Sequence, residues 1–177
     1  MTFIIFSDGG SRGNPGNAAF GFVVKTQNPI FNFQFPISNE IPKINIQIIN
    51  NCVYGSGFLG VTTNNQAEYH GILEALKFLK FQILNSKSQI NSNVQNTNDQ
   101  KVNVECFLDS QLIVEQMNGN YKIKNEGLKP LYWEIRQLIM DLGGHVTFCH
   151  VPREQNKEAD LLVNECIDNE LNKKRTV

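Results

Sequence analysis

The stretch MTFIIFSDGGSRGNPGNAAF, Met1 to Phe20, decides the fold. Phe3 to Phe6 is wholly apolar, too short for a helix and rich in β-forming residues, so it predicts a central strand buried on both faces. Asp8 is expected where this strand ends, carried straight out of the core, and a desolvated carboxylate is costly unless a positive partner meets it. The glycines between Gly9 and Gly16 predict a sharp turn that a ligand can approach closely. The alternative is an ordinary turn after a solvated Asp.

Composition favours one globular domain over residues 1–177. Hydrophobic residues make up 41% and charged residues 19% of the 177 residues, which is ordinary for a packed domain. Lys and Arg number 16 against 17 Asp and Glu, a net charge of −1, so the overall charge does not indicate a nucleic-acid binder. Two bound divalent cations would change that charge to about +3. Any surface that binds nucleic acid must therefore be local.

The four cysteines are far apart and form no C-x-x-C pair, which indicates structural thiols in a reducing cytoplasm. They are Cys52, Cys106, Cys149 and Cys166. No stretch approaches the roughly 18 apolar residues of a membrane span. We therefore expect a cytoplasmic protein with no membrane contact, and no protein partner is evident.

The order of the remaining elements predicts a mixed α/β sheet of five strands flanked by helices. Further strands are expected at Ala18–Lys25, Cys52–Thr62, Val102–Leu108 and His145–Val151, and helices at Thr63–Leu84, Gln111–Met117, Leu128–Leu142 and Gln155–Leu171. Thr63 and Gln66 predict a capping box at the start of the first helix, and Ser110 is expected to cap the second. An insert at Ile30–Asn51 contains alternating isoleucines that would suit an edge ribbon lengthening the first hairpin. The Asn-rich stretch Asn85–Lys101 is expected to be a loop.

Four acidic residues stand at related places in this pattern. Asp8 and Asp109 are expected at strand ends, and Glu68 and Asp160 in the early turns of helices. Taken alone, Glu68 also suits a partner of the helix dipole. Clustered carboxylates repel one another, so a group of four predicts bound cations. Oxygen ligands without His or Cys favour Mg²⁺ or Mn²⁺, and two such ions about 4 Å apart would clamp a phosphodiester.

At these acids the sequence resembles the type 1 ribonucleases H, and more closely their short prokaryotic branch without a basic protrusion. Four segments carry the resemblance: DGGSRGNPG (Asp8–Gly16), TTNNQAEY (Thr62–Tyr69), LDSQLIVEQMNG (Leu108–Gly119) and HVPREQNKEAD (His150–Asp160). They lie in the family's order, and each delivers one acid. The resemblance implies a ribonuclease H-like fold. It also implies an enzyme that hydrolyses the RNA strand of an RNA/DNA hybrid, leaving 5′-phosphate and 3′-hydroxyl ends.

The resemblance also implies roles for single residues. Asp8 corresponds to the acid that bridges two Mg²⁺ ions, for which Mn²⁺ is a substitute. Glu68 and Asp109 correspond to ligands on the leaving-group side, and Asp160 to the ligand on the water side. His150, ten residues before Asp160, stands where the family places a mobile catalytic His. Without the family's longer glycine-bearing loop, a hydrogen-bonded structural His remains the alternative.

Selection of a hybrid requires a reader of 2′-hydroxyls, and side-chain amides serve because they both donate and accept. The resemblance matches Asn14, Asn64 and Asn65 to positions that contact the hybrid, and Ser11 is a further candidate beside them. Turn formation and helix capping also explain the asparagines. Candidates for phosphate contacts are Arg12, Lys122, Lys124, Arg153 and Lys157. Without the basic protrusion, binding is expected to be weak and to fall steeply with salt.

Two other readings stay open at this point. One is another nuclease or strand transferase of the same fold superfamily. The other is a non-catalytic domain that binds RNA/DNA hybrids, although clustered negative charge beside phosphate does not favour binding alone.

Overall fold

The computed structural model describes residues 1–26, 33, 44–90 and 102–175. Within them the chain forms six strands, four α-helices and one 3₁₀-helix. The strands are β1 (Thr2–Gly13), β2 (Gly16–Thr26), β3 (Asn45–Ile49), β4 (Cys52–Thr62), β5 (Asn103–Leu108) and β6 (Val146–His150). The helices are α1 (Asn64–Ile90), α2 (Gln111–Met117), α3 (Lys129–Asp141), η1 (Arg153–Gln155) and α4 (Lys157–Arg175).

The strands form one mixed sheet in the order β3-β4-β2-β1-β5-β6. β1, β2, β4 and β3 pair antiparallel, whereas β5 and β6 run parallel to β1. The prediction of a mixed α/β sheet is confirmed, but its count of five strands is wrong. The sixth strand is β3, in which Ile46 and Ile48 alternate with exposed residues and pack against the core. The alternating isoleucines of the insert therefore belong to an edge strand. The rest of the insert, 30–32 and 34–43, lies outside the described residues.

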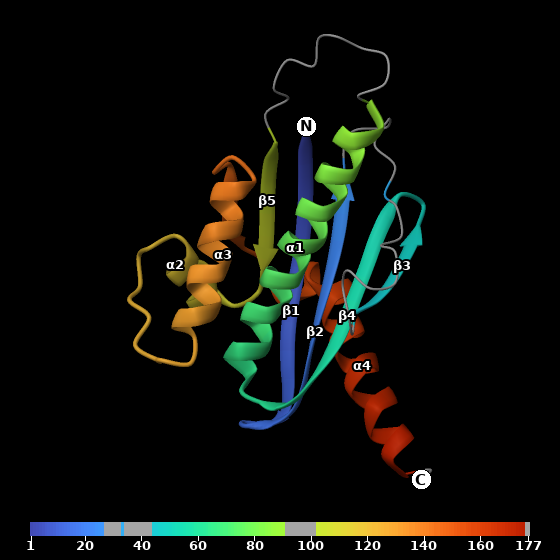
Figure 1. Ribbon diagram of the computed structural model, residues 1–177. Coiled ribbons are helices and arrows are strands. Elements are labelled where there is room, and N and C mark those ends of the chain that lie inside the picture. The colour runs from blue at the N-terminus through green and yellow to red at the C-terminus, as the bar shows by residue number, and fades with distance from the viewer. Residues whose placement is uncertain (27–32, 34–43, 91–101, 176–177) are drawn as a thin grey trace.

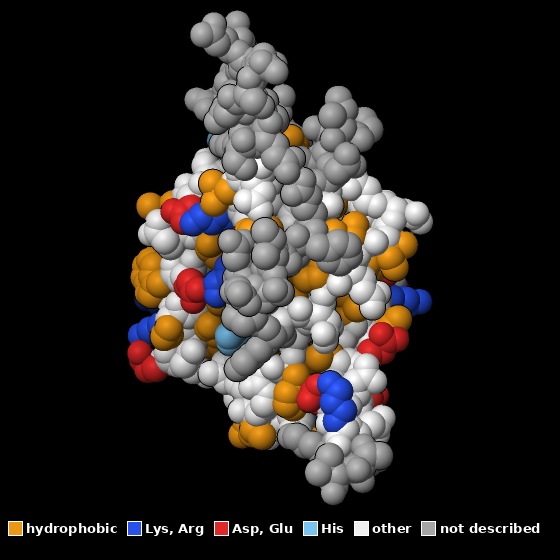
Figure 2. Space-filling view, turned by 45° about the vertical axis from the view of Figure 1, so that its right-hand side comes forward, with side chains coloured by type: hydrophobic (Ala, Val, Ile, Leu, Met, Phe, Trp, Pro, Cys, Tyr) orange, Lys and Arg blue, Asp and Glu red, His pale blue; other side chains and the backbone are white. Residues whose placement is uncertain are grey.

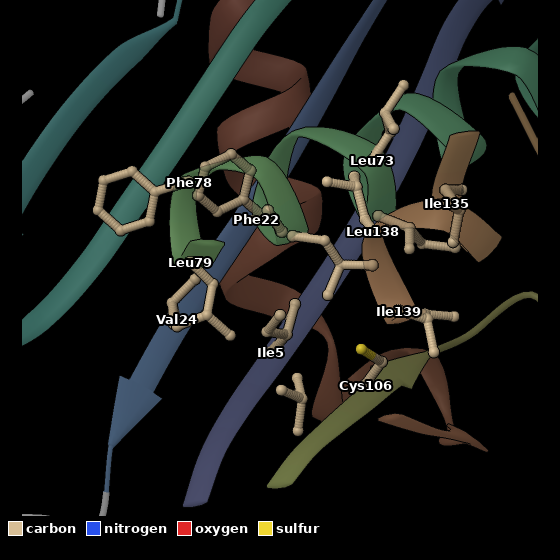
Figure 3. Close-up of a cluster of buried hydrophobic side chains, with 14 of the residues drawn as sticks. Ile5, Phe22, Val24, Leu73, Phe78, Leu79, Cys106, Ile135, Leu138 and Ile139 are labelled. Atoms are coloured by element: carbon tan, nitrogen blue, oxygen red, sulfur yellow. The ribbon is translucent and has the colours of Figure 1, made fainter. Parts of the chain in front are cut away.

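α1 and α3 cover one face of the sheet, and α4 lies on the opposite face (Figure 1). The core between the sheet, α1 and α3 contains Phe22, Leu73, Leu79, Cys106 and Ile135, whose side chains converge in Figure 3. This core fixes α1 across β1 and β2. A smaller cluster under α4 is formed by Ala19, Val163, Cys166 and Ile167.

β1 differs from its prediction in two ways. It continues through the glycines to Gly13, because Gly9 and Gly10 pair with Phe20 and Ala19 of β2, and the turn comes only at the cis Asn14–Pro15 bond. Its second face is only partly covered. Phe3 and Ile5 are fully buried, but Ile4 and Phe6 on the other face are half-buried, because α4 does not extend over this part of β1.

The helix boundaries also differ from those that the sequence predicts. α1 continues past Leu84 to Ile90, so the stretch predicted as an Asn-rich loop begins as helix, and 91–101 lie outside the described residues. α4 begins two residues later and ends four residues later than expected. Ser110 stands at the N-cap of α2 but makes no side-chain capping hydrogen bond, so its predicted capping role is wrong.

Charges on the face shown in Figure 2 lie as neighbouring pairs of opposite sign among small groups of hydrophobic side chains. Pairs of this kind include Lys80 with Asp141, at 2.6 Å, and Lys173 with Glu170, at 2.6 Å. In the part of the chain that the structure describes, no helix is long and apolar enough to cross a membrane.

Candidate active site

The sheet register places Asp8 and Asp109 at the same level. Phe6 of β1 is paired with Phe107 of β5, so each acid stands two residues beyond a member of this pair. The parallel pairing ends here, and the two chains diverge, β1 into its hairpin with β2 and β5 into α2. The amide of Gly9 donates to Oδ1 of Asp8, at 2.8 Å. Asp8 is therefore at the end of the parallel pairing, although it is not at the end of its own strand.

Glu68 reaches this place because α1 begins at a fixed point and crosses β1 closely. The predicted capping box is confirmed: Gln66 N donates to Thr63 Oγ1 at 3.3 Å, and Thr63 N donates to Gln66 Oε1 at 3.4 Å. A Cβ built on Gly9 would lie 2.1 Å from the backbone of Ala67 and Glu68. The sequence predicts that the bare backbone allows a ligand to approach closely, but at Gly9 the space is occupied by α1.

Asp160 reaches the site because a second glycine allows a helix to approach the opposite face of the sheet closely. A Cβ on Gly21 of β2 would lie 2.6 Å from the carbonyl oxygen of Ala159. This close crossing sets the first turn of α4 against the sheet. There, Arg153 donates to Oδ1 of Asp160 at 2.5 Å, and Asn164, one turn later, donates to Oδ2 at 3.2 Å.

All four acids line a single cavity of about 210 Å³. Its other lining residues are Gly9, Gly10, Ser11, Arg12, Asn64, Arg153, Val163, Asn164 and Ile167. The acids come from β1, α1, the end of β5 and α4, so the fold collects in one place residues that are up to 152 positions apart in the sequence. A cluster that requires four separate elements to converge is not an incidental surface group.

Burial and mutual repulsion raise the pKa values of two of these acids. Burial, and then the charge of Asp109, raise the pKa of Asp8 to about 7, with Glu68 and Asp160 adding to the effect and the Gly9 amide opposing it. Burial also raises the pKa of Glu68 to about 7, with Asp109 adding and the side chains of Ser110 and Asn64 opposing. The Ser110 side chain therefore interacts with Glu68 and does not cap the N-terminus of α2.

These shifts predict how the stability of the metal-free protein depends on pH. Because the folded pKa values lie above the ordinary 3.8 and 4.5, the folded state binds more protons between about pH 4 and 7. The free energy of unfolding should therefore fall as the pH rises through this window. We expect thermal melts in a chelator to show this loss, and the Asp8→Asn/Glu68→Gln double variant to show less of it. Equal pH dependence in the two proteins would contradict the shifts.

The donor set fits hard divalent cations. Asn64 donates to Oε1 of Glu68 at 2.8 Å, whereas the buried Oε2 of Glu68 has no hydrogen-bond partner among the described residues. Such an orphaned oxygen suits a metal ligand, and the acids supply only oxygen ligands. In the arrangement described here, no three His, Cys, Asp or Glu side chains of the described residues are close enough together to hold an ion. Asp160 is directed to Arg153 instead.

The other predicted residues lie at or beside the cavity, with Asn65 set apart. His150 ends β6 and is exposed, with Nε2 3.2 Å from the carbonyl oxygen of Asp109. Asn14 Oδ1 accepts from the amide of Asn64 at 3.2 Å, and Ser11 donates to the Gly13 carbonyl at 2.5 Å. The bond between Asn14 and Asn64 joins the β1–β2 turn to the start of α1, whereas the Ser11 bond stays within β1.

Asn65 lines a neighbouring groove of about 570 Å³ together with Lys122 and Lys124. Arg12 lines the main cavity and pairs with Asp168, at 3.2 Å. Lys157 is exposed at the start of α4. Arg12 and Arg153 thus line the main cavity and Lys122 and Lys124 the second groove, whereas Lys157 lines neither.

Sequence reasoning missed Asn156 and Asn164. Asn164 stands four residues after Asp160, a helical spacing that would have placed it on the same face. Asn156 precedes a helix, where an asparagine is usually read as a cap. Its donation to Asp109 Oδ1, at 3.0 Å, has no signal in the sequence.

Comparisons with known proteins agree with this arrangement. A family model described as reverse transcriptase-like matches residues 94–166. The Bifunctional protein Rv2228c of Mycobacterium tuberculosis is 30% identical over 168 residues, covering 95% of this chain and 36% of that protein. Ribonuclease HI of Halobacterium salinarum is 28% identical over 163 residues, 92% of this chain and 63% of that protein. The chain thus spans about a third of the length of the mycobacterial relative.

Among solved structures, LC11-RNase H1 in complex with an RNA/DNA hybrid superimposes with a TM-score of 0.69 and 34% identity. The match covers 96% of this chain and 99% of that one. Identity at this level over almost the whole of both chains, with the same fold, confirms the resemblance seen in the four acid-bearing segments. The chain belongs to the type 1 ribonuclease H family.

Proposed function

We propose that this chain hydrolyses the RNA strand of RNA/DNA hybrids with two Mg²⁺ ions, for which Mn²⁺ is a substitute. The products would carry 5′-phosphate and 3′-hydroxyl ends. The observation that carries the proposal is the convergence of Asp8, Glu68, Asp109 and Asp160 on one cavity. The solved complex of LC11-RNase H1 with a hybrid supports the choice of substrate.

The four carboxylates would hold the two ions. Asp8 is the acid whose pKa is raised by all three others, so it is the one placed to serve both ions. Glu68 offers its unpartnered Oε2, and Asp160 becomes available when Arg153 releases it. Ions bound there would supply activation of the attacking water and stabilisation of the leaving oxygen of the phosphodiester.

His150 is proposed as a catalytic group at the rim of the cavity. Its exposed ring has one hydrogen-bond contact among the described residues, to the backbone of Asp109, and can turn toward the water side. Imidazole can accept a proton near neutral pH and therefore suits the role of a base beside an attacking water. A purely structural His would instead hold the end of β6.

The substrate would lie along the edge of the cavity. Asn14 and Asn64 join the β1–β2 turn to the start of α1, and Ser11 lies in β1 just before this turn. We propose that these three residues contact 2′-hydroxyls, with Asn65 beside them. Arg153, whose side chain is 70% exposed, would exchange Asp160 for a phosphate of the substrate.

Hybrid binding should depend strongly on salt, because the net charge of −1 leaves only local phosphate contacts. We expect the affinity to fall about tenfold or more between 50 and 200 mM salt. Arg153→Gln should weaken binding and make the slope of log K against log salt shallower by about one. Lys80→Gln, which breaks the pair with Asp141 on α3, is the matched control and should leave the slope unchanged. Fluorescence anisotropy in a chelator measures both, and an unchanged slope in Arg153→Gln would remove it from the interface.

Cleavage of end-labelled duplexes tests the proposed function. Hybrid, RNA/RNA and DNA/DNA duplexes of one sequence are incubated with Mg²⁺, with Mn²⁺ and with EDTA. We expect cutting of the RNA strand of the hybrid in either metal and none in EDTA. Binding of the hybrid without cutting in both metals would instead indicate the non-catalytic domain.

The free thiols of all four cysteines fit the proposed location in a reducing cytoplasm.

A further inference from the structure

Asn156 stands at the start of α4 but does not act as a cap. Its backbone oxygen accepts from Asp160 N at 3.1 Å, which is the bond that an N-cap residue makes. A capping asparagine also turns its side-chain oxygen to a free amide of the first turn. Here Oδ1 is buried and has no hydrogen-bond partner among the described residues, and the whole residue is 1% exposed.

The side chain is directed across the sheet instead. Nδ2 donates to the carbonyl oxygen of Ser7 at 3.0 Å and to Oδ1 of Asp109 at 3.0 Å. Ser7 immediately precedes Asp8 in β1. One buried amide thus connects the backbone beside Asp8, the carboxylate of Asp109 and the turn that begins the helix of Asp160.

We propose that Asn156 is a positioning residue for the metal site. The hydrogen bond from Asn156 to Oδ1 of Asp109 fixes the carboxylate in one orientation and leaves Oδ2 free for an ion. The donation to Ser7 fixes the spacing between β1 and α4. Hydrogen bonds to metal ligands set ligand geometry, and their loss typically costs 10- to 100-fold in metal affinity or activity. The inference rests on the proposed function, because it assigns Asp109 to a metal.

The chain offers a matched control for the other reading, in which Asn156 only ties α4 to the sheet. Asn118, at the C-cap of α2, donates from Nδ2 to the carbonyl oxygen of Phe148 at 3.1 Å. This bond likewise joins a helix end to a strand, but it involves no carboxylate. Serine at position 156 is a good N-cap residue and is too short to reproduce either bond.

The test is calorimetric titration of Mn²⁺ into the substrate-free protein for the wild type, Asn156→Ser and Asn118→Ser. We expect Asn156→Ser to bind Mn²⁺ at least about 10-fold more weakly and Asn118→Ser to stay within about twofold of the wild type. In cleavage assays the Mg²⁺ concentration for half-maximal rate should rise in Asn156→Ser, with kcat largely recovered at saturating Mg²⁺. A lower melting temperature with unchanged Mn²⁺ affinity would overturn the proposal.

A measurement on the wild type covers the case in which Asn156→Ser fails to fold. The side-chain NH₂ resonances of Asn156 should shift during a Mg²⁺ titration followed by NMR, whereas those of Asn118 should not. Static Asn156 resonances in a protein that binds Mg²⁺ would overturn the proposal. If the wild type bound no metal, both the proposed function and this inference would fall. If it cleaved hybrid and Asn156→Ser bound Mn²⁺ equally well, only the inference would fall.

Discussion

Asp8→Asn is expected to lower the rate of hybrid cleavage by at least about 10³-fold, because the ions that Asp8 would share supply several kcal/mol of transition-state stabilisation. Asparagine keeps the size of the side chain and an oxygen that can accept from the Gly9 amide, as Asp8 Oδ1 does at 2.8 Å. It removes a charge that is opposed by burial and by three other acids. Single-turnover cleavage of a labelled hybrid in Mg²⁺ measures the loss.

Two controls separate a lost reaction from a lost fold. At pH 8 in a chelator, Asp8→Asn should melt no lower than the wild type, because the ionised Asp8 is itself unfavourable in the folded protein. Hybrid binding in the chelator should be unchanged or tighter, since negative charge beside phosphate is removed. Retention of a tenth or more of the wild-type rate would show that Asp8 does not hold the ions.

Gly9→Ala is expected to destabilise the protein by about 3 kcal/mol or more, at or above the upper end of the usual cost of overpacking. The added Cβ would lie 2.1 Å from backbone atoms of Ala67 and Glu68, and backbone in the first turns of α1 cannot rotate away as a side chain can. α1 must move off β1, which also withdraws Glu68 from Asp8. We therefore expect cleavage to fall in the molecules that remain folded. Urea unfolding followed by circular dichroism measures the stability.

Gly10→Ala is the matched control in the same strand. Its Cβ would meet only the Cγ1 atom of Val163, at 3.0 Å, and this end of a side chain can shift by a few tenths of an ångström. The loss of stability should therefore be clearly smaller than for Gly9→Ala. Equal losses for the two variants would show that the close crossing of α1 is not what Gly9 provides.

The sequence was most informative where chemistry and periodicity coincide. The four acids could be found because each follows an apolar strand or opens an amphipathic helix, and the structure places all four on one cavity. The capping box of Thr63 and Gln66 fixed the start of α1 within one residue. α2 was predicted with its exact bounds because polar residues stand on both sides of a short apolar run.

The remaining features depend on contacts between distant segments. The glycines after Asp8 predict a turn, but pairing with β2 keeps Gly9 and Gly10 in the strand, and α1 occupies the space beside Gly9. Edge strand β3 exists because β4 supplies its partner. Asn156 is 149 residues from Ser7 and 47 from Asp109, and a local pattern contains no information about such contacts.

Anomalous diffraction from crystals grown with Mn²⁺ and a non-cleavable RNA/DNA hybrid tests the two-metal site most directly. We expect two Mn²⁺ peaks about 4 Å apart, with Asp8 contacting both, and with Glu68, Asp109 and Asp160 among their ligands. We also expect Arg153 to have left Asp160. Peaks at other residues, or a bound hybrid with no peak at these four carboxylates, would contradict the proposed two-metal site.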